Sequence, residues 1–319
     1  MNTGEPVPEQ YFSIAAVERD TGLSKDTLRV WERRYGFPRP QRDSAGDRVY
    51  PPDQVERLHQ IRRLLDAGHR PGRIVALEPE ALQALSQPAA ASGRLVATDS
   101  APSLEVFLDL IQRHDVNHLR RLLGESALRL GLVGFVTSVV APLNTAVGEA
   151  WINGRFQVFE EHLYTECVTG VLRNAIAGIP APQGAGAPRV LLTSFPDEPH
   201  GLGLLMAEAL FALEGCSCLP LGPQTPVSDI AKAALAHRAD IVGLSFTTLL
   251  GAKAMLAGLL ELRRQLPQGV AIWVGGNSTV LARREVPGVL PVQDLASLSA
   301  RVADWRSQAM NSHVKEDGA

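Results

Sequence analysis

One loop in the last third of the chain combines side chains that could do chemistry. Glu198, His200 and Gly203 follow the apolar run VLLTS and precede the helical run LLMAEALFALEG. An imidazole nitrogen can bind a transition metal, and a carboxylate two residues away can accept the other ring N–H and fix the tautomer. The alternative interpretation is a histidine that faces solvent or caps the next helix. The elements around the loop help to decide between the two.

Four short apolar runs alternate with helical stretches between residues 188 and 308: VLLTS, CSCLPLG, DIVGLSF and VAIWVGG. This alternation predicts an α/β domain with a doubly wound, parallel, Rossmann-like sheet. Such sheets bind ligands beyond the carboxyl ends of their strands. The histidine loop, the segment Ser245-Phe246-Thr247 and the pair Gly275-Gly276 each follow a strand end, so we expect them at one edge.

Residues 103–180 show helical spacing in about four pieces, with breaks near Asp115, Gly131 and Asn153. This pattern predicts a four-helix bundle. The bundle sequence WINGRFQVFEEH contains Trp151, Glu161 and His162, which taken alone indicate a core tryptophan, a solvated acid and a satisfied histidine. A small, polar stretch at residues 81–102 predicts a flexible linker before the bundle.

Residues 11–80 predict short helices with tight turns. Gly22 ends the first helix, Ser24 caps the second, and Leu28 and Trp31 lie on the buried face of that second helix. The proline-rich sequence FPRPQRDSAGDRVYPP predicts a loop or small hairpin. A third helix then has the apolar stripe Val55, Leu58, Ile61 and Leu65.

The second helix and the loop after it are basic. The helix carries Lys25, Arg29, Arg33 and Arg34, and the loop adds Arg39, Arg42 and Arg48. Residues 11–75 contain 13 Lys/Arg against 9 Asp/Glu, a balance of +4, so the rest carries −7 because the whole chain carries −3. This pattern favours a helix-turn-helix with a wing that binds a polyanion, although an ordinary solvated helix face has the same charges.

Length and composition restrict the class of protein. The 319 residues are enough for two or three domains. Cys167, Cys216 and Cys218 form no disulfide framework and no CxxC metal pair. The N-terminus lacks the layout of a signal peptide, and no apolar run reaches the roughly 18 uninterrupted residues of a membrane span. We therefore expect a cytoplasmic protein that does not enter a membrane.

Residues 11–80, called the head below, resemble the DNA-binding domain of MerR-type regulators. The most specific part of the resemblance is the run TLRVWERRYG...P.R...G.RVY...D. The resemblance implies an all-α winged helix-turn-helix that binds double-stranded operator DNA, with Trp31 in its core. The DNA-binding residues that it implies are Lys25, Thr27, Arg29, Arg33, Tyr35, Arg42 and Arg48.

The strand-end residues resemble the cobalamin-binding motif of methionine synthases and mutases, which consists of a histidine loop, Ser-x-Leu/Thr and Gly-Gly. The resemblance implies that His200 is the lower axial ligand of cobalt and that Glu198, where the family usually has Asp, orients it. Gly201 and Gly203 would let the backbone approach the corrin ring. The other cofactor-binding residues that it implies are Ser245, Thr247, Gly275 and Gly276.

The full order of segments resembles the CarH/LitR family of light-responsive, cobalamin-dependent repressors. In that family the bundle caps the upper face of adenosylcobalamin, which implies that Trp151 packs over the adenosyl group and that Glu161 and His162 line its pocket. One position departs from the light-sensing members, which have a histidine directly after that tryptophan. Here the position is Ile152, which cannot bind cobalt. After photolysis, His162, another group or solvent would have to take its place, or the protein responds differently.

The resemblance implies a transcriptional repressor, not an enzyme, with adenosylcobalamin as chromophore. A cofactor-dependent homo-oligomer, dimer or tetramer, would hold the operator in the dark and release it after light breaks the cobalt–carbon bond. One alternative is a light-independent cobalamin sensor, which Ile152 favours. Another is a corrinoid enzyme or methyl carrier, against which the MerR-type head and the lack of a substrate domain argue.

Overall fold

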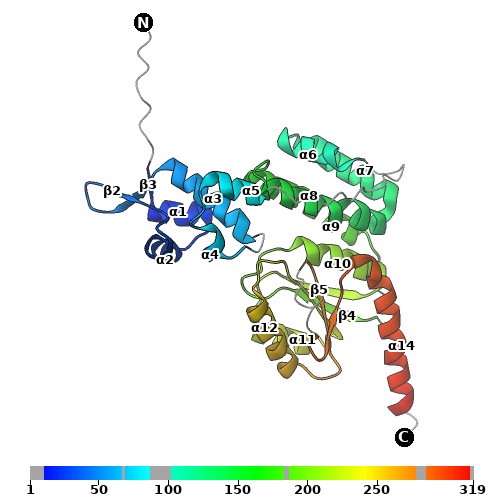
Figure 1. Cartoon of the computed structure of the whole chain (residues 1–319). Helices are drawn as coiled ribbons and strands as arrows, with labels where there is room; N and C mark the ends of the chain where they lie inside the picture. Colours follow the sequence, from blue (N-terminus) through cyan, green and yellow to red (C-terminus); the bar gives the residue numbers. More distant parts are fainter. Residues whose placement is uncertain (1–10, 67–68, 87–101, 183–186, 278–284, 317–319) are drawn as a thin grey trace. The chain divides into compact units, whose positions relative to one another are not determined.

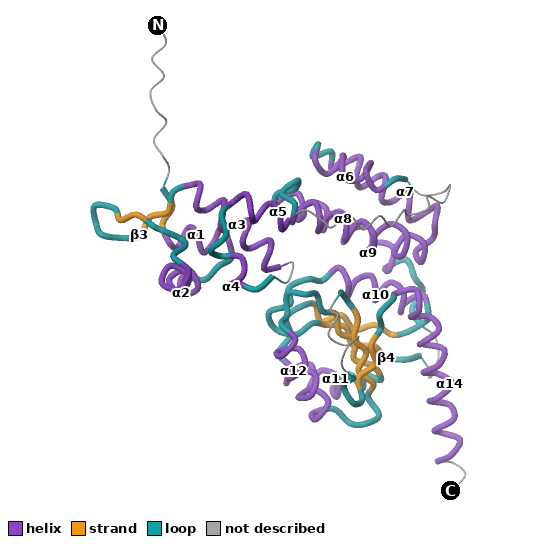
Figure 2. Tube along the Cα trace, viewed as in Figure 1, coloured by secondary structure: helices purple, strands orange, loops and turns teal. Residues whose placement is uncertain are grey.

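The computed structural model describes residues 11–66, 69–86, 102–182, 187–277 and 285–316 (Figure 1). The chain forms two compact units. The first contains the head and residues 149–157, and the second contains the rest of the bundle and the α/β domain. Helices make up most of the described chain, and the strands of the large sheet lie together in the α/β domain (Figure 2).

The head consists of short helices with well-defined ends. Ser24 begins α2 because its hydroxyl accepts a hydrogen bond from the backbone N–H of Thr27 at 3.1 Å. Gly22 (φ 68°) ends α1 and Gly36 (φ 71°) ends α2, both in the left-handed conformation that glycine adopts without strain. The predicted cap and stop are therefore confirmed. The head contains β1 (Phe12–Ser13), α1 (Ile14–Thr21), α2 (Lys25–Tyr35), β2 (Gln41–Arg42), β3 (Arg48–Tyr50), α3 (Pro52–Asp66), α4 (Pro71–Ile74) and α5 (Pro79–Ser86).

One apolar core holds these helices together. Leu28 and Trp31 are buried in it, as the sequence predicts. The stripe of α3 needs one correction, because Leu64 is fully buried whereas Leu65 is only partly buried against the same core. Helix α5 starts before the predicted boundary at residue 80 and adds Leu82 to the core. The remainder of the predicted linker, residues 87–101, lies outside the described residues.

The predicted hairpin forms the wing, which consists of β2 and β3. Strand β3 pairs antiparallel with β2 and with β1, so the three strands form a small sheet in the order β1-β3-β2. Gly46 (φ 85°) lies in the turn between β2 and β3. The wing therefore starts on the body of the head and ends in an exposed tip.

The bundle contains α6 (Leu104–Gln112), α7 (Val116–Phe135), the π-helix η1 (Val136–Val140), α8 (Ala141–Ile152) and α9 (Val158–Ala177). The three predicted breaks are confirmed. Asp115 caps α7 by accepting from the N–H of His118 at 3.1 Å, Gly131 (φ 68°, ψ 167°) kinks α7, and α8 ends at Ile152, directly before Asn153. By length and composition alone, the stretch Val116–Ile152 could span a membrane. In the structure its helix α7 packs against α6, α9 and α10, as a bundle helix does.

The α/β domain has a five-stranded parallel sheet. The four predicted strands are present as β4 (Arg189–Thr193), β5 (Ser217–Gly222), β6 (Ile241–Ser245) and β7 (Ala271–Gly275), and a short fifth strand, β8 (Val289–Pro291), extends the edge. The order is β5-β4-β6-β7-β8. The chain first moves from β4 to one side and then returns to place β6 on the other, so the switch point of the sheet lies between β4 and β6.

Helices cover both faces of this sheet, which confirms the doubly wound fold. Side chains of α11 (Val227–Ala236) and α12 (Ala252–Gln265) share a core with Ile272 and Val274. Trp273 points to the opposite face, where its ring lies 5.8 Å from that of Phe211 in α10 (Leu202–Leu213). Helix α14 (Leu298–Glu316) packs against α10 and extends beyond the predicted domain end at residue 308.

Candidate functional site

The histidine loop lies at the switch point of the parallel sheet. It connects β4 to α10, and the loop with Thr247 leaves the neighbouring strand β6. Because the carboxyl ends of parallel strands lie at one edge, the two loops meet although Glu198 and Thr247 are 49 residues apart. The structure thus brings together the loop residues that the sequence assigned to one site.

Glu198 is the centre of the hydrogen bonds between these loops. Its Oε2 accepts from the backbone N–H of Thr247 at 2.7 Å and from the hydroxyl of Thr247 at 2.8 Å. Its Oε1 lies 2.6 Å from Nδ1 of His200 and accepts the backbone N–H of His200 at 3.3 Å. Only 1% of the Glu198 side chain is exposed. The carboxylate is thus fixed by both loops.

This environment keeps Glu198 ionised. Burial alone would raise the pKa of Glu198, but the hydrogen bonds from His200 and Thr247 outweigh it and hold the pKa below its ordinary value of 4.5. An ionised carboxylate accepts hydrogen bonds and donates none, so Nδ1 of His200 must carry the proton. In the neutral imidazole the lone pair is then on Nε2, and the side chain is 54% exposed. His200 is therefore oriented as a metal ligand would be.

Ser194 is a further member of this site that the sequence analysis did not identify. Its buried hydroxyl donates to the carbonyl oxygen of Glu198 at 2.7 Å and accepts the N–H of Gln224 at 3.0 Å. The carbonyl of Ser194 also accepts the N–H of Thr225 at 2.9 Å. Ser194 thus ties the histidine loop to the loop after β5. A serine at the end of a buried apolar strand is the only sequence signal of this role.

Two predicted glycines have packing reasons of their own. A Cβ at Gly203 would lie 2.7 Å from Oγ of Ser245, so glycine leaves room for that side chain against α10. A Cβ at Gly276 (φ 102°) would overlap the carbonyl oxygen of Phe246. Gly203 therefore lets α10 pack against the end of β6, and Gly276 lets the residues after β7 pack against those after β6, whatever ligand approaches them. Gly201 begins α10, and Gly275 ends β7.

The predicted bundle residues lie in both units. Trp151 is half-buried near the end of α8, beside Ile152, and belongs to the first unit. Glu161 and His162 lie in the first turns of α9 and belong to the second unit. Glu161 accepts the hydroxyl of Thr165 at 2.8 Å, and Nε2 of His162 lies 3.7 Å from its other carboxylate oxygen. Glu161 and His162 are thus neighbours that share one polar contact.

Within the second unit, a chain of polar contacts connects the bundle to the α/β domain. The buried hydroxyl of Tyr164 in α9 donates to the amide oxygen of Asn144 in α8, and Nδ2 of Asn144 lies 3.8 Å from the sulfur of Met206 in α10. Helix α10 is the helix that follows the histidine loop. Met206 thus joins this helix to the bundle.

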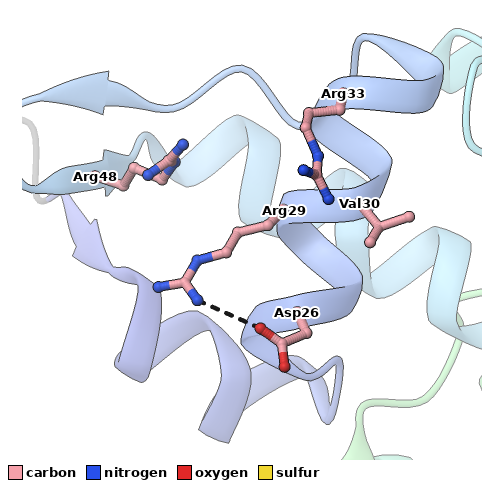
Figure 3. Close-up of a pocket in the computed structure, with 5 residues that line it drawn as sticks. All are labelled: Asp26, Arg29, Val30, Arg33 and Arg48. Atoms are coloured by element: carbon pink, nitrogen blue, oxygen red, sulfur yellow. Dashed lines mark hydrogen bonds and ion pairs between the residues drawn. The ribbon is translucent and has the colours of Figure 1, made fainter.

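The other candidate site is the basic surface of the head (Figure 3). Arg29, Val30 and Arg33 of α2 line a shallow hollow together with Asp26, and Arg48 reaches it from the wing strand β3. Recognition helices of this type present one exposed face to the major groove of DNA. The hollow thus combines helix and wing residues that the sequence predicted to bind DNA.

Most of the predicted DNA-binding cations already have carboxylate partners. Lys25 lies 3.4 Å from Glu18, Arg29 lies 3.3 Å from Asp26, and Arg48 lies 3.0 Å from Glu32. These ion pairs are at least partly exposed, so phosphate groups can compete for the cations.

The remaining predicted DNA-binding residues have varied surroundings. Thr27 shares a hydrogen bond of 2.8 Å with the Ser24 hydroxyl, and Arg42 donates to the carbonyl of Gly46 at 2.6 Å in the wing. Tyr35 is half-buried at the end of α2, under the guanidinium of Arg34. Thr27 and Tyr35 therefore contribute to the helix itself, whereas Arg42 reaches from the wing.

Comparison with known proteins places these sites in a family. The MerR HTH family regulatory protein model matches residues 12–80, and two B12 binding domain models match residues 103–175 and 188–292. The chain is 34% identical over 272 residues to the HTH-type transcriptional repressor CarH of Myxococcus xanthus, which covers 84% of this chain and 89% of that protein. The chain belongs to the CarH family. It is also 29% identical over 236 residues to the HTH-type transcriptional repressor CarA of the same organism, with 73% and 75% covered.

A solved structure supports the fold of the larger part of the chain. The monomethylamine corrinoid protein of Methanosarcina barkeri aligns with 62% of this chain and 96% of its own, with a TM-score of 0.51 at 14% identity. At that identity the similarity concerns the fold alone. The family models and the CarH relative confirm a CarH-type regulator with a MerR-type DNA-binding head and B12-binding domains.

The residues at the switch point fit a cobalamin. An oriented imidazole with a lone pair on Nε2 is a suitable axial ligand for cobalt, and the buried carboxylate supplies the support that such ligands need. Within the described part of the chain, three or more His, Cys, Asp or Glu side chains do not gather as a metal site.

Proposed function

We propose that this CarH-family protein is a light-responsive transcriptional repressor of the cytoplasm that uses adenosylcobalamin as its chromophore. The observation that carries the proposal is the buried Glu198, whose carboxylate lies 2.6 Å from Nδ1 of His200 and so orients the ring for binding cobalt through Nε2. When bound, adenosylcobalamin supplies a cobalt–carbon bond that green light can break. The MerR-type head on the same chain makes operator DNA the output.

The chain's own residues have separate tasks in this proposal. His200 would bind cobalt through Nε2, with Glu198 and Thr247 holding its tautomer and ring. Ser245, Gly201, Gly203, Gly275 and Gly276 would line the space around a bound corrinoid. Trp151, Glu161 and His162 would line the pocket of its adenosyl group.

The response requires that the cofactor bind one assembly better than the other. We propose that the bound adenosyl group favours a homo-oligomer, dimer or tetramer, whose heads occupy adjacent operator sites in the dark. Loss of the adenosyl group would let α8 and α9 shift relative to α10, through the contacts of Asn144, Tyr164 and Met206. Shifting such an equilibrium almost completely needs a difference of about 5.5 kcal/mol between the two assemblies.

A second candidate function is a cobalamin sensor that does not respond to light. Ile152 favours it, because this side chain has no atom that can bind cobalt at the position directly after Trp151. Such a sensor would use the same His200 site but would read occupancy instead of photolysis.

The experiment compares the protein before and after green light. The full chain is loaded with adenosylcobalamin in the dark, and its absorption spectrum, elution volume and binding to a selected DNA duplex are recorded. A spectral change with a smaller assembly and lost DNA binding supports the photoreceptor. Photolysis without a change in assembly or DNA binding supports the light-independent sensor.

Two variants sharpen this experiment. His200→Ala is expected to weaken cobalamin binding and to abolish the light effect on DNA. Ile152→His introduces an imidazole after Trp151, and a photoproduct spectrum that differs from that of the wild type would show that this position faces the cofactor. Failure of the wild type to bind any cobalamin would contradict both candidate functions.

A further inference from the structure

Val30 is an exposed apolar side chain among the residues that line the basic hollow of the head. It is 42% exposed, and the residues around it in the hollow are Asp26, Arg29, Arg33 and Arg48 (Figure 3). On the opposite side of α2, Leu28 and Trp31 fill the core. Val30 thus lies on the face that is available to DNA and is not part of the apolar core of the head.

The structure of α2 gives no reason for a valine at this position. A β-branched side chain loses rotamer freedom in a helix, so alanine or a straight-chain residue would suit an exposed helical site better. An apolar side chain also gains nothing from water. The reason for Val30 is therefore expected to lie in the ligand of this surface.

The major groove of DNA offers one apolar group, the C5-methyl of thymine, and apolar side chains recognise it by contact. Arginine in turn recognises O6 and N7 of guanine through two hydrogen bonds. Arg29 precedes Val30 directly, and its guanidinium is held by Asp26 at 3.3 Å on the exposed face. Two neighbouring side chains of one recognition helix can reach neighbouring base pairs.

We propose that Val30 reads the methyl group of a thymine in the major groove, next to a guanine that Arg29 reads. Each half of the operator then contains a thymine and a guanine in adjacent base pairs. This inference rests on the DNA-binding part of the proposed function and does not depend on light or cobalamin.

The test removes the contact between Val30 and the thymine methyl group, first by changing the DNA and then by changing the protein. Duplexes that the full chain binds are first selected from a random library, with and without adenosylcobalamin in the dark. Each thymine of the selected duplex is then replaced by deoxyuridine, which lacks only the methyl group. We expect one thymine in each half-site at which this change weakens binding about fourfold, the value of burying one methyl group.

The variant Val30→Ala should lose a similar factor on the thymine duplex and nothing further on the deoxyuridine duplex, because the contact is already gone. Val106→Ala is the matched control, since Val106 is 43% exposed but lies on α6 of the bundle. This control should retain the full effect of the methyl group. Circular dichroism melting should show that neither variant is unfolded.

Two results would overturn the inference, and they are distinguishable. The role of Val30 alone would be refuted if the losses of DNA affinity from Val30→Ala and from deoxyuridine are additive at every thymine. It would also be refuted if sequence-selective binding is weakened by neither change. No sequence-selective DNA binding under any condition would contradict the proposed function as well.

Discussion

The α/β domain and the head each place a glutamate beside a histidine or arginine side chain, but the two glutamates differ in burial. Glu198 is 1% exposed and lies 2.6 Å from His200. Glu32 is 29% exposed, and its partner Arg48 is 31% exposed at 3.0 Å. Glu198 also accepts two hydrogen bonds from Thr247, whereas the contacts of Glu32 with Arg48 join two exposed surfaces of helix and wing.

The difference matches the ligands that the two sites would bind. A metal ligand must be held in one tautomer and one orientation before the metal arrives, which a buried carboxylate with several donors achieves. A DNA-binding arginine must leave its partner for a phosphate or a base, which an exposed ion pair of small net energy permits. The buried Glu198 therefore holds His200 in one geometry, whereas the more exposed Glu32 allows Arg48 to change its partner.

The largest effect on stability is expected from replacing a glycine that has a positive φ in each of the two regions. Gly276→Ala should destabilise the α/β domain by about 3 kcal/mol or more, because the new Cβ overlaps the carbonyl of Phe246 at a positive φ. Gly46→Ala in the wing should cost only about 1–2 kcal/mol, since its φ is also positive but no atom lies within 4 Å of the new Cβ. Urea unfolding of both variants would measure this, and equal losses would contradict the close packing of the strand-end loops.

The second largest effect is the difference in stability loss when Glu198 or Glu32 is replaced by alanine. Glu198→Ala leaves the donors of Thr247 and His200 without an acceptor, and we expect a loss of about 2–4 kcal/mol in unfolding free energy. Glu32→Ala should lose less than about 1 kcal/mol. Unfolding followed by circular dichroism checks both. A larger loss for Glu32 than for Glu198 would reverse the comparison.

The pH dependence follows from the lowered pKa of Glu198. Its ionised form stabilises the fold above the ordinary value of 4.5, and this stabilisation should be lost as the pH falls through the lower folded pKa. Unfolding free energies of the wild type measured from pH 7 to about pH 3 should therefore fall more steeply at the acid end than those of Glu198→Gln. Parallel curves for the two proteins would mean that Glu198 is not held ionised.

Thr247 should contribute less than Glu198 itself. Thr247→Val removes the hydroxyl donor but keeps the backbone N–H, so a loss of about 1–2 kcal/mol in stability and on the order of tenfold in cobalamin affinity is expected. Spectral titration with hydroxocobalamin measures the affinity. Thr247→Ser keeps the hydroxyl and should restore the affinity, and a serine variant as weak as the valine variant would exclude the hydrogen bond as the cause.

The smallest effect concerns the ion pair between Glu32 and Arg48 in the head. Glu32→Gln frees Arg48, and we expect roughly two- to fivefold tighter DNA binding at low salt, the size of an exposed ion pair. The gain should disappear at high ionic strength because screening weakens the pair and the phosphate contacts alike. Fluorescence anisotropy with a selected duplex measures it. Weaker binding of this variant would mean that Glu32 orients Arg48 and does not compete for it.

Local signals in the sequence predicted much of the fold. Ser24, Gly22, Asp115 and Gly131 act within one turn of the chain, so their caps and breaks could be predicted from residue type. The strands were predictable because buried parallel strands are short apolar runs. Strand β8 was missed, since only three residues form it and the last of them is a proline.

The hydrogen bonds of the candidate site were less predictable. Their partners come together only through the order of the strands, as for Thr247 and Glu198 or for Ser194 and Gln224. The motif identified Glu198 and His200 but not Ser194, which has no motif of its own. The ion pair of Arg48 with Glu32 was likewise not evident, because the charge pattern alone does not say which acid lies opposite the wing.

Electron paramagnetic resonance tests directly whether Nε2 of His200 binds cobalt. The full chain is produced with histidine that carries the heavy nitrogen isotope and is loaded with the cobalt(II) form of cobalamin. If His200 is the ligand, the label changes the nitrogen splitting of the cobalt signal from a triplet to a doublet, and His200→Ala abolishes this change. A triplet that the label leaves unaltered in the wild type would contradict binding by His200, because the nitrogen would then belong to the cofactor's own base.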